Sequence, residues 1–442
     1  METFFGDRLL ISSGAAEEIY AQVKDLPIID YHCHLDETKI AANAGFADIG
    51  ELWLAGDHYK WRAMRLCGVD EEYITGKSSF HDKFVKYAEI LPQLVGNPLY
   101  YWSHLELKQI FGIDEPLNAK SAERIWNRAN ETLKNLRVQD LFRQFRVEYV
   151  ATTDDPMSDL AAHGKHGGTR VSPTFRPDKL YALDEGYLEA LGKSAGAEIT
   201  SLDGLLSAIS KRLDYFAGKG CKISDHGFEK FPKRYADRAE AEALFARRKT
   251  LNAEEKDAFF GFLLVWLAKE YAKRNMIMQL HFSVVRNNNS QMFGRCGVDS
   301  GFDLISGEQS VKDLILFFNQ VSDDERPQTV LYTLNDNNLS AIAAVTGAFR
   351  KVRMGAAWWF NDTVEGIRKN LSVVSEYSAL GTSFGMLTDS RSFSSYVRFD
   401  FFRRILSDYL GNFVEKGEYP LESAVQTAKN ICYYNLKEAL GL

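Results

Sequence analysis

A repeated alternation of short β-rich runs with longer helical stretches constrains the fold of this chain more than any other feature. Each run is apolar and ends in a polar residue, and a helical stretch follows most of them. Such alternation predicts βα units and a parallel sheet. The runs are Pro27–His34, Arg146–Thr153, Thr169–Phe175, Cys221–Asp225, Met276–His281, Gln328–Thr333, Lys351–Gly355 and Phe384–Asp389.

The helical stretches that separate the runs complete the pattern. Eight parallel strands with helices between them is the number that closes a barrel. We therefore predict an α/β fold, a (β/α)8 barrel of the TIM type, that forms a single domain over residues 1–442. The expected helices are Leu205–Phe216, Ala253–Asn275, Val311–Gln320, Asn338–Phe349 and Val364–Tyr377.

The long interval between the first two runs, residues 36–145, breaks this regular spacing. It is rich in aromatic residues and shows the pattern of several helices, without a Pro/Gly/Ser linker to isolate it. Loops that follow barrel strands emerge on the active-site face. We therefore predict an inserted helical subdomain that packs on the barrel over this face.

The charge and cysteine content of the chain limit the binding partners and the cellular compartment that we expect. The chain has a net charge of -7, which argues against nucleic acid or an anionic membrane, although local arginines could still bind a small anion. Its five cysteines form no CxxC pair, and the N-terminus lacks the pattern of a signal peptide. We expect a cytoplasmic protein with reduced thiols; a homo-oligomer is compatible with the sequence, which does not specify one.

The sharpest local signal is the pair of histidines that ends the first run. His32 and His34 are two residues apart, so on a strand both side chains point to the same side and can face one metal ion. His281 ends the fifth run and Asp389 ends the eighth. In a barrel these positions share one rim, so the pattern predicts a metal and substrate site there.

Further polar and aromatic residues are expected near the same rim. Arginines suit carboxylate recognition, and a His–Tyr pair could transfer protons. No dinucleotide-binding, P-loop or GxSxG pattern is present, so no such cofactor is indicated. The additional candidates are Arg170, Arg286, Arg391, His58, Tyr59, Asp225, Trp358 and Trp359.

Several of these motifs together resemble the uronate isomerase (glucuronate isomerase) family of the amidohydrolase superfamily. The resemblance runs from about residue 5 to the C-terminus, and its motifs occur in the family's order. They are Asp-Tyr-His-Cys-His-Leu at 30–35, Asp-His-Tyr-Lys-Trp at 57–61, His-Phe-Ser-Val-Val-Arg-Asn-Asn-Asn at 281–289, Trp-Trp-Phe-Asn-Asp at 358–362 and Leu-Thr-Asp-Ser-Arg-Ser-Phe at 387–393.

The resemblance implies an activity, a cofactor and residue roles. The activity would interconvert D-glucuronate with D-fructuronate and D-galacturonate with D-tagaturonate. His32, His34 and Asp389 would hold one divalent metal ion, zinc by analogy, and His58 and Tyr59 would join in proton transfer. The implied substrate-binding residues are Arg170, Asp225, His281, Arg286, Arg391 and one or both of Trp358 and Trp359.

Some alternatives stay open at this level. Asp389, instead of Tyr59, could act as the base, and a hydride shift could replace proton transfer. A metal-dependent hydrolase of the same superfamily would use the same rim to activate water, and a non-catalytic barrel could bind sugar acids. Binuclear hydrolases carry a lysine on strand four, whereas the fourth run ends in Asp225, which favours a single metal.

Overall fold

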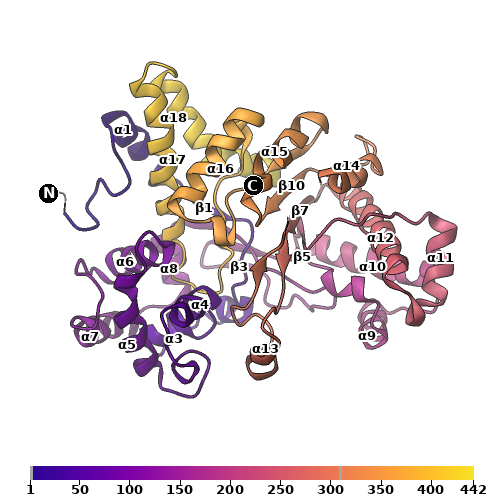
Figure 1. Ribbon diagram of the computed structural model, residues 1–442, viewed down its shortest axis with the longest axis horizontal. Coiled ribbons are helices and arrows are strands. Elements are labelled where there is room, and N and C mark those ends of the chain that lie inside the picture. The colour runs from indigo at the N-terminus through magenta and orange to yellow at the C-terminus, as the bar shows by residue number, and fades with distance from the viewer. Residues whose placement is uncertain (1–2, 308–310) are drawn as a thin grey trace.

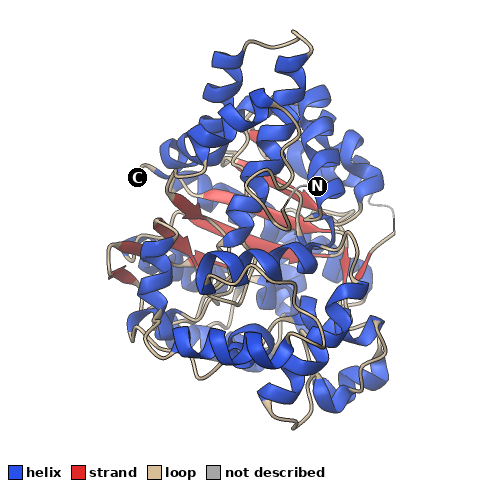
Figure 2. Cartoon of the chain, turned by 90° about the vertical axis from the view of Figure 1, so that its left-hand side faces the viewer, coloured by secondary structure: helices blue, strands red, loops and turns tan. Residues whose placement is uncertain are grey.

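The computed structural model describes residues 3–307 and 311–442. Figure 1 shows the parallel strands following one another along the chain, and Figure 2 shows helices on both sides of them. The strands are β1 (Ile28–Asp30), β2 (Val147–Ala151), β3 (Gly164–His166), β4 (Thr169–Ser172), β5 (Thr174–Phe175), β6 (Ile223–Phe228), β7 (Ile277–Phe282), β8 (Val284–Val285), β9 (Leu304–Ile305), β10 (Thr329–Thr333) and β11 (Val352–Met354).

Two parallel ladders meet at a single interrupted strand. One ladder runs β1-β2-β4 and the other runs β11-β10-β7-β6-β5. Pro173 lies between β4 and β5 and has no N–H to donate, so the ladder breaks there while the segment stays extended. β3 adds to the edge of β4 in antiparallel pairing, and β8 pairs with β9. The predicted mixed α/β fold with a parallel sheet is confirmed.

The last expected run, residues 384–389, does not form a ladder strand. It nevertheless lies against the first strand, because the Asp389 N–H donates to the His32 carbonyl at 3.1 Å and the His34 N–H donates to the Ser390 carbonyl at 2.9 Å. The side chain of Arg353 in β11 contacts the start of this segment: its guanidinium lies 4.4 Å from the Phe384 ring and donates to the Thr382 carbonyl, just before the segment, at 3.1 Å. The irregular segment thus joins the end of the strand order to its start, where a regular eighth strand was predicted.

The helices between strands agree with the predicted ones to within a few residues. None of the helices in the described part of the chain is long and apolar enough to cross a membrane. They are α1 (Gly14–Val23), α9 (Glu185–Ala195), α10 (Leu202–Gly218), α11 (Arg238–Ala246), α12 (Ala253–Lys273), α13 (Ser290–Cys296), α14 (Val311–Asn319), α15 (Leu339–Ala348), α16 (Val364–Tyr377), α17 (Val397–Glu415), α18 (Leu421–Lys429) and α19 (Asn435–Leu440).

A helical block lies between β1 and β2 and packs on the C-terminal helices. In α6, Trp102 lies 3.8 Å below the Arg398 guanidinium of α17 and 6.3 Å from the Phe401 ring. The two groups of helices therefore share one apolar core. The helices of the block are α2 (Glu37–Ala41), α3 (Ile49–Leu54), α4 (His58–Leu66), α5 (Phe80–Ile90), α6 (Pro98–Phe111), α7 (Ala122–Leu133) and α8 (Val138–Gln144).

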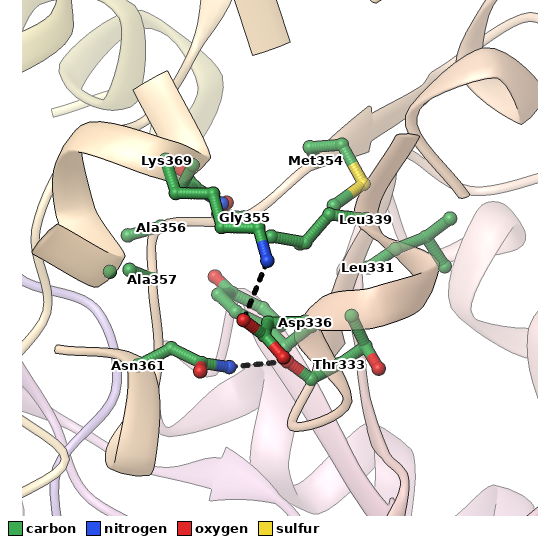
Figure 3. Close-up of a pocket in the computed structure, with 13 residues that line it drawn as sticks. Leu331, Thr333, Asp336, Leu339, Met354, Gly355, Ala356, Ala357, Asn361 and Lys369 are labelled. Carbon is green, nitrogen blue, oxygen red and sulfur yellow. Dashed lines mark hydrogen bonds and ion pairs between the residues drawn. The ribbon is translucent and has the colours of Figure 1, made fainter. Parts of the chain in front are cut away.

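The residue that follows β11, Gly355, has no room for a side chain. A Cβ atom placed there would lie 2.1 Å from the Tyr332 ring. Tyr332 is buried, stacks on His281 with ring centroids 4.3 Å apart and donates to the Tyr31 hydroxyl at 3.2 Å. Figure 3 shows Gly355 in a small pocket near the ion pair of Lys369 and Asp336.

We predict that Gly355→Ala lowers the free energy of unfolding by about 1–3 kcal/mol, the usual cost of overpacking a filled core. The matched control is Gly347→Ala in α15, where an added methyl group would meet nothing within 4 Å and alanine is the better helix former. Thermal unfolding of the three proteins tests this. Equal midpoints for Gly355→Ala and the parent chain would contradict the prediction.

Candidate active site

Two histidines and one aspartate converge where the last segment meets β1. His32 and His34 lie in the extended chain after β1 and point to the same side, as predicted. The Nε2 atoms of both rings lie 3.1 Å from Asp389 Oδ1. Two imidazoles and a carboxylate within 4.8 Å of one another are a donor set for a divalent metal ion such as zinc.

A second group that could hold a metal ion consists of His32, Asp225 and His281, and all three residues are buried. Asp225, at the middle of β6, accepts from His281 Nδ1 at 2.6 Å, and its other oxygen lies 3.9 Å from His32 Nδ1. The two nitrogens of His32 thus face two different carboxylates. Metal-binding histidines commonly present their second nitrogen to a carboxylate that orients the ring. This arrangement favours His32, His34 and Asp389 as ligands, with Asp225 orienting His32.

The protonation states of Asp389, His34 and Asp225 suit a cation, whereas Asp225 and Asp389 outweigh burial and raise the pKa of His32. Burial tends to raise the pKa of Asp389, but the hydrogen bonds from His32 and His34 outweigh it and hold that pKa well below its usual range. Burial lowers the pKa of His34 to about 4. For Asp225, burial is again outweighed, here by Arg176, and its pKa is well below the usual range. Ionised carboxylates and a neutral imidazole are the forms that bind metal ions.

His32, His34 and Asp389, which we call the metal-type cluster, line a pocket of about 640 Å³. Trp358 forms part of the wall and donates from its Nε1 to Asp389 Oδ2 at 2.8 Å. Trp359 lines the same pocket, so both tryptophans face it. His281 also lines it, and its Nε2 atom is buried without a hydrogen-bond partner among the described residues. An unpartnered buried nitrogen is costly unless a bound ligand satisfies it.

Three arginines line this pocket, but Arg170 is not one of them. Arg170 is exposed in β4, near the start of the interrupted strand, and does not line the pocket. Arg176, directly after β5, lines it instead and contacts Asp225 at 2.9 Å and Asp178 at 2.8 Å. Arg170 does not reach the pocket because of its position along the strand. Side chains of the active-site rim follow the C-terminal ends of the strands, and Arg170 lies near the start of its strand.

The other two arginines are held by two aspartates of the loop between α13 and β9, residues 297–303, which we call the rim loop. Arg286 Nη1 lies 2.9 Å from Asp303 Oδ2, and Arg391 Nη2 lies 2.8 Å from Asp299 Oδ2. Both arginines line the pocket, as does Asp299. The rim therefore carries cationic groups that are partly neutralised by carboxylates, and an anionic ligand could take the place of these carboxylates at the guanidinium groups.

His58 and Tyr59 begin α4, and only His58 lines the large pocket. Asp57 caps this helix by accepting from the Tyr59 N–H at 2.9 Å. The His58 ring lines the large pocket and lies 5.3 Å from the Trp359 ring. Tyr59 stacks on His58 but lines a neighbouring pocket of about 200 Å³. The structure thus places His58 in the wall of the large pocket and Tyr59 behind that wall.

Comparison with known proteins gives likenesses over nearly the full chain. The glucuronate isomerase family matches residues 1–440. The uronate isomerase of Clostridium perfringens is 40% identical and covers 98% of this chain and 98% of its own length. The crystal structure of uronate isomerase from Thermotoga maritima is 35% identical, with a TM-score of 0.96 over 99% of this chain and 100% of its own. That of glucuronate isomerase from Caulobacter crescentus is 28% identical, with a TM-score of 0.94 over 99% and 97%.

Asp362 is a buried carboxyl that ends the Trp-Trp-Phe-Asn-Asp motif, but the sequence analysis gave it no role. Its Oδ2 accepts from the Tyr59 hydroxyl at 3.2 Å, and its Oδ1 has no hydrogen-bond partner among the described residues. Burial raises the pKa of Asp362 to about 8, against the opposing effect of Arg398. Its raised pKa means that the neutral form dominates in the folded protein at neutral pH.

This raised pKa has a consequence for stability. The unfolded chain releases the Asp362 proton near pH 4 and the folded chain near pH 8, so its contribution is complete below pH 4 and is lost as the pH rises to about 8. We predict that Asp362→Asn gains stability relative to the parent chain between pH 5 and pH 8, by up to about 1.4 kcal/mol per pH unit.

Thermal unfolding of both proteins across this pH range measures the difference. Asp114→Asn, which removes an exposed carboxyl, is the control for the loss of one charge. If the free energy of unfolding of Asp362→Asn and that of the parent chain change equally with pH, Asp362 is not neutral in the folded protein and the prediction is contradicted.

Proposed function

Because this chain belongs to the glucuronate isomerase family and therefore isomerises hexuronates, we propose that the pocket described above interconverts D-glucuronate with D-fructuronate and D-galacturonate with D-tagaturonate. The observation that carries the proposal is the meeting of three arginines with a histidine–aspartate cluster around one pocket. The arginines can recognise the carboxylate of a hexuronate, and the histidine–aspartate cluster can bind its sugar oxygens. No observation favours a hydrolase or a non-catalytic barrel.

A single divalent metal ion belongs to the proposal, and we propose zinc. His32, His34 and Asp389 would hold it, as their shared contact at Asp389 Oδ1 and the neutral His34 support. When bound, such an ion supplies positive charge that stabilises a developing enediolate oxygen. The deeper Asp225 would keep His32 in the orientation that binding requires.

The arginines would bind and orient the substrate. A guanidinium pairs with a carboxylate through two parallel hydrogen bonds, and Arg391 and Arg286 stand at the rim for the C6 carboxylate. Arg176, with His281 and Asp225 behind it, would face the sugar hydroxyls. Fixing the carboxylate end of the substrate aligns C1 and C2 with the reacting groups, which converts binding energy into rate.

The reaction moves a hydrogen from C2 to C1 while the C1 carbonyl becomes a hydroxyl and the C2 hydroxyl becomes a carbonyl. No external oxidant is needed. Burial lowers the pKa of His58, so this ring is neutral at the pocket wall and can accept a proton. Burial, with Asp362, raises the pKa of Tyr59 well above its usual value, so its hydroxyl is protonated and can donate.

We propose that His58 and Tyr59 act together as the proton-transfer pair, with a cis-enediol between the two transfers. Asp389 is the alternative base, since its carboxylate is ionised and faces the pocket.

We also propose that the enzyme is cytoplasmic, in keeping with its free cysteines, Cys33, Cys67, Cys221, Cys296 and Cys432.

The test of this function compares two arginines. The parent chain should convert D-glucuronate to its 2-ketose and leave D-glucose, which lacks the carboxylate, unchanged. We predict that Arg176→Lys lowers kcat/KM for D-glucuronate at least about 30-fold, equivalent to about 2 kcal/mol, because a lysine does not reproduce both ion pairs.

The matched control is Arg170→Lys, an exposed arginine outside the pocket, which should keep kcat/KM within about twofold of the parent. Circular dichroism confirms that both variants are folded. If Arg176→Lys is as active as the parent, Arg176 does not bind the substrate. If the parent converts neither uronate, the proposed function itself is refuted.

A further inference from the structure

A second pocket of about 200 Å³ lies behind the wall of the large pocket. The two pockets share His58 and Trp359, which stand side by side with ring centroids 5.3 Å apart. The proposed reaction places no substrate atom in this second pocket. Its lining comes from α4, from the start of α6 and from the loop after β11, and includes Tyr59, Arg62, Leu66, Asn97 and Asp362.

The second pocket contains a buried carboxyl, that of Asp362, which has no role in the proposed reaction. Asp362 is 3% exposed, and its only side-chain hydrogen bond among the described residues is the one to the Tyr59 hydroxyl. Arg398 of α17 is the cation that opposes the raised pKa of Asp362, but it packs on Trp102 and donates from Nη1 to the Thr388 carbonyl at 2.7 Å instead of forming an ion pair with Asp362. Burial of a carboxyl with one free oxygen costs stability.

The turn that carries Asp362 is itself strained. Trp359 begins the short helix η6 (Trp359–Asn361) with a φ of 51°, in the left-handed region that bulky residues rarely adopt. The Asp362 N–H closes this turn on the Trp359 carbonyl at 3.1 Å. The same turn therefore directs Trp358 to Asp389, Trp359 into the wall between the pockets, and Asp362 to Tyr59.

Tyr59 has little else to fix its hydroxyl. Its ring stacks on His58, lies 5.9 Å from the Trp102 ring and has the Arg398 guanidinium 5.2 Å away, and these contacts hold the plane of the ring. The hydrogen bond to Asp362 alone orients the O–H. Loss of this acceptor would leave the hydroxyl without a protein partner among the described residues.

We propose that Asp362 is a positioning residue for the isomerisation: from the second pocket, its carboxyl fixes the Tyr59 hydroxyl and thereby the Tyr59 ring that stacks on His58, whose own ring lines the substrate pocket. This inference rests on the proposed role of Tyr59 and His58 in proton transfer. The charged and titratable groups around Asp362 are Tyr59, His58 and Arg62 of α4, Arg398 of α17, Asp303 of the rim loop, and Asp389.

The test compares Asp362→Leu, Asp362→Asn and Tyr59→Phe with D-glucuronate. Leucine keeps the approximate size and removes the acceptor, so we expect kcat to fall at least about tenfold with KM within about twofold, the pattern of lost alignment. Asparagine keeps an acceptor oxygen and should restore most of this kcat. It should also remove the change in kcat near pH 8 that ionisation of Asp362 produces in the parent enzyme.

A double substitution tests whether Asp362 acts through Tyr59. Tyr59→Phe should lower kcat strongly, and Tyr59→Phe/Asp362→Leu should be no slower than Tyr59→Phe alone, because both changes remove the same hydrogen bond. Leu66→Ala, at an exposed residue that lines the same pocket, is the control and should leave kcat unchanged.

The possible failures are distinguishable. Full activity of Asp362→Leu beside an inactive Tyr59→Phe would overturn the role of Asp362 and leave the proposed function intact. Full activity of Tyr59→Phe would overturn both the proton-transfer role of Tyr59 and the role of Asp362. If Asp362→Leu does not fold, the pH profile decides, and identical profiles for Asp362→Asn and the parent would overturn the proposal.

Discussion

The contact between the chain after β1 and the segment at Asp389 is the interaction on which the rest of the site depends. Residues more than 350 positions apart are joined there by backbone hydrogen bonds and by the two histidine rings that meet Asp389 Oδ1. Asp389 has a φ of 46°, a strained conformation for a residue other than glycine. The strain is sustained because Asp30, fully buried, accepts from both the Thr388 N–H and its hydroxyl.

Around this contact, the three arginines of the pocket and His281 each contact a carboxylate. His281 and Arg176 share Asp225, while Arg286 and Arg391 are paired with Asp303 and Asp299 of the rim loop. Such pairing fixes the direction of polar groups before a substrate arrives, which is how enzymes avoid the cost of reorganising charge during the reaction. The paired loop carboxylates also mean that a uronate would compete with the protein's own acids for the rim arginines.

Several parts of this arrangement could be predicted from sequence because strand periodicity carries them. His32, His34, His281 and Asp389 each interrupt or end an apolar run, so their place at one rim follows from the parallel fold. The structure places the predicted Arg170 outside the pocket, because a run of apolar residues does not show where the strand reaches the rim. Arg176, one residue past the run, was the available signal.

Other features depend on contacts that periodicity does not encode. The last segment keeps its place without a ladder, held by backbone bonds to the chain after β1 and by Asp30. Asp299 and Asp303 reach the rim from a long loop whose path no local pattern determines. Asp362 depends on a strained turn at Trp359. Loop geometry and tertiary packing thus decide which polar residues join the site, whereas the strands decide where it lies.

The most direct test of the central claim is proton NMR of the purified protein with D-glucuronate in D2O, before and after removal of bound metal with a chelator. We predict signals of the 2-keto acid with deuterium at C1, loss of this conversion on chelation, and its return when zinc is added. A metal-loaded protein that leaves both D-glucuronate and D-galacturonate unchanged would contradict a metal-assisted hexuronate isomerase.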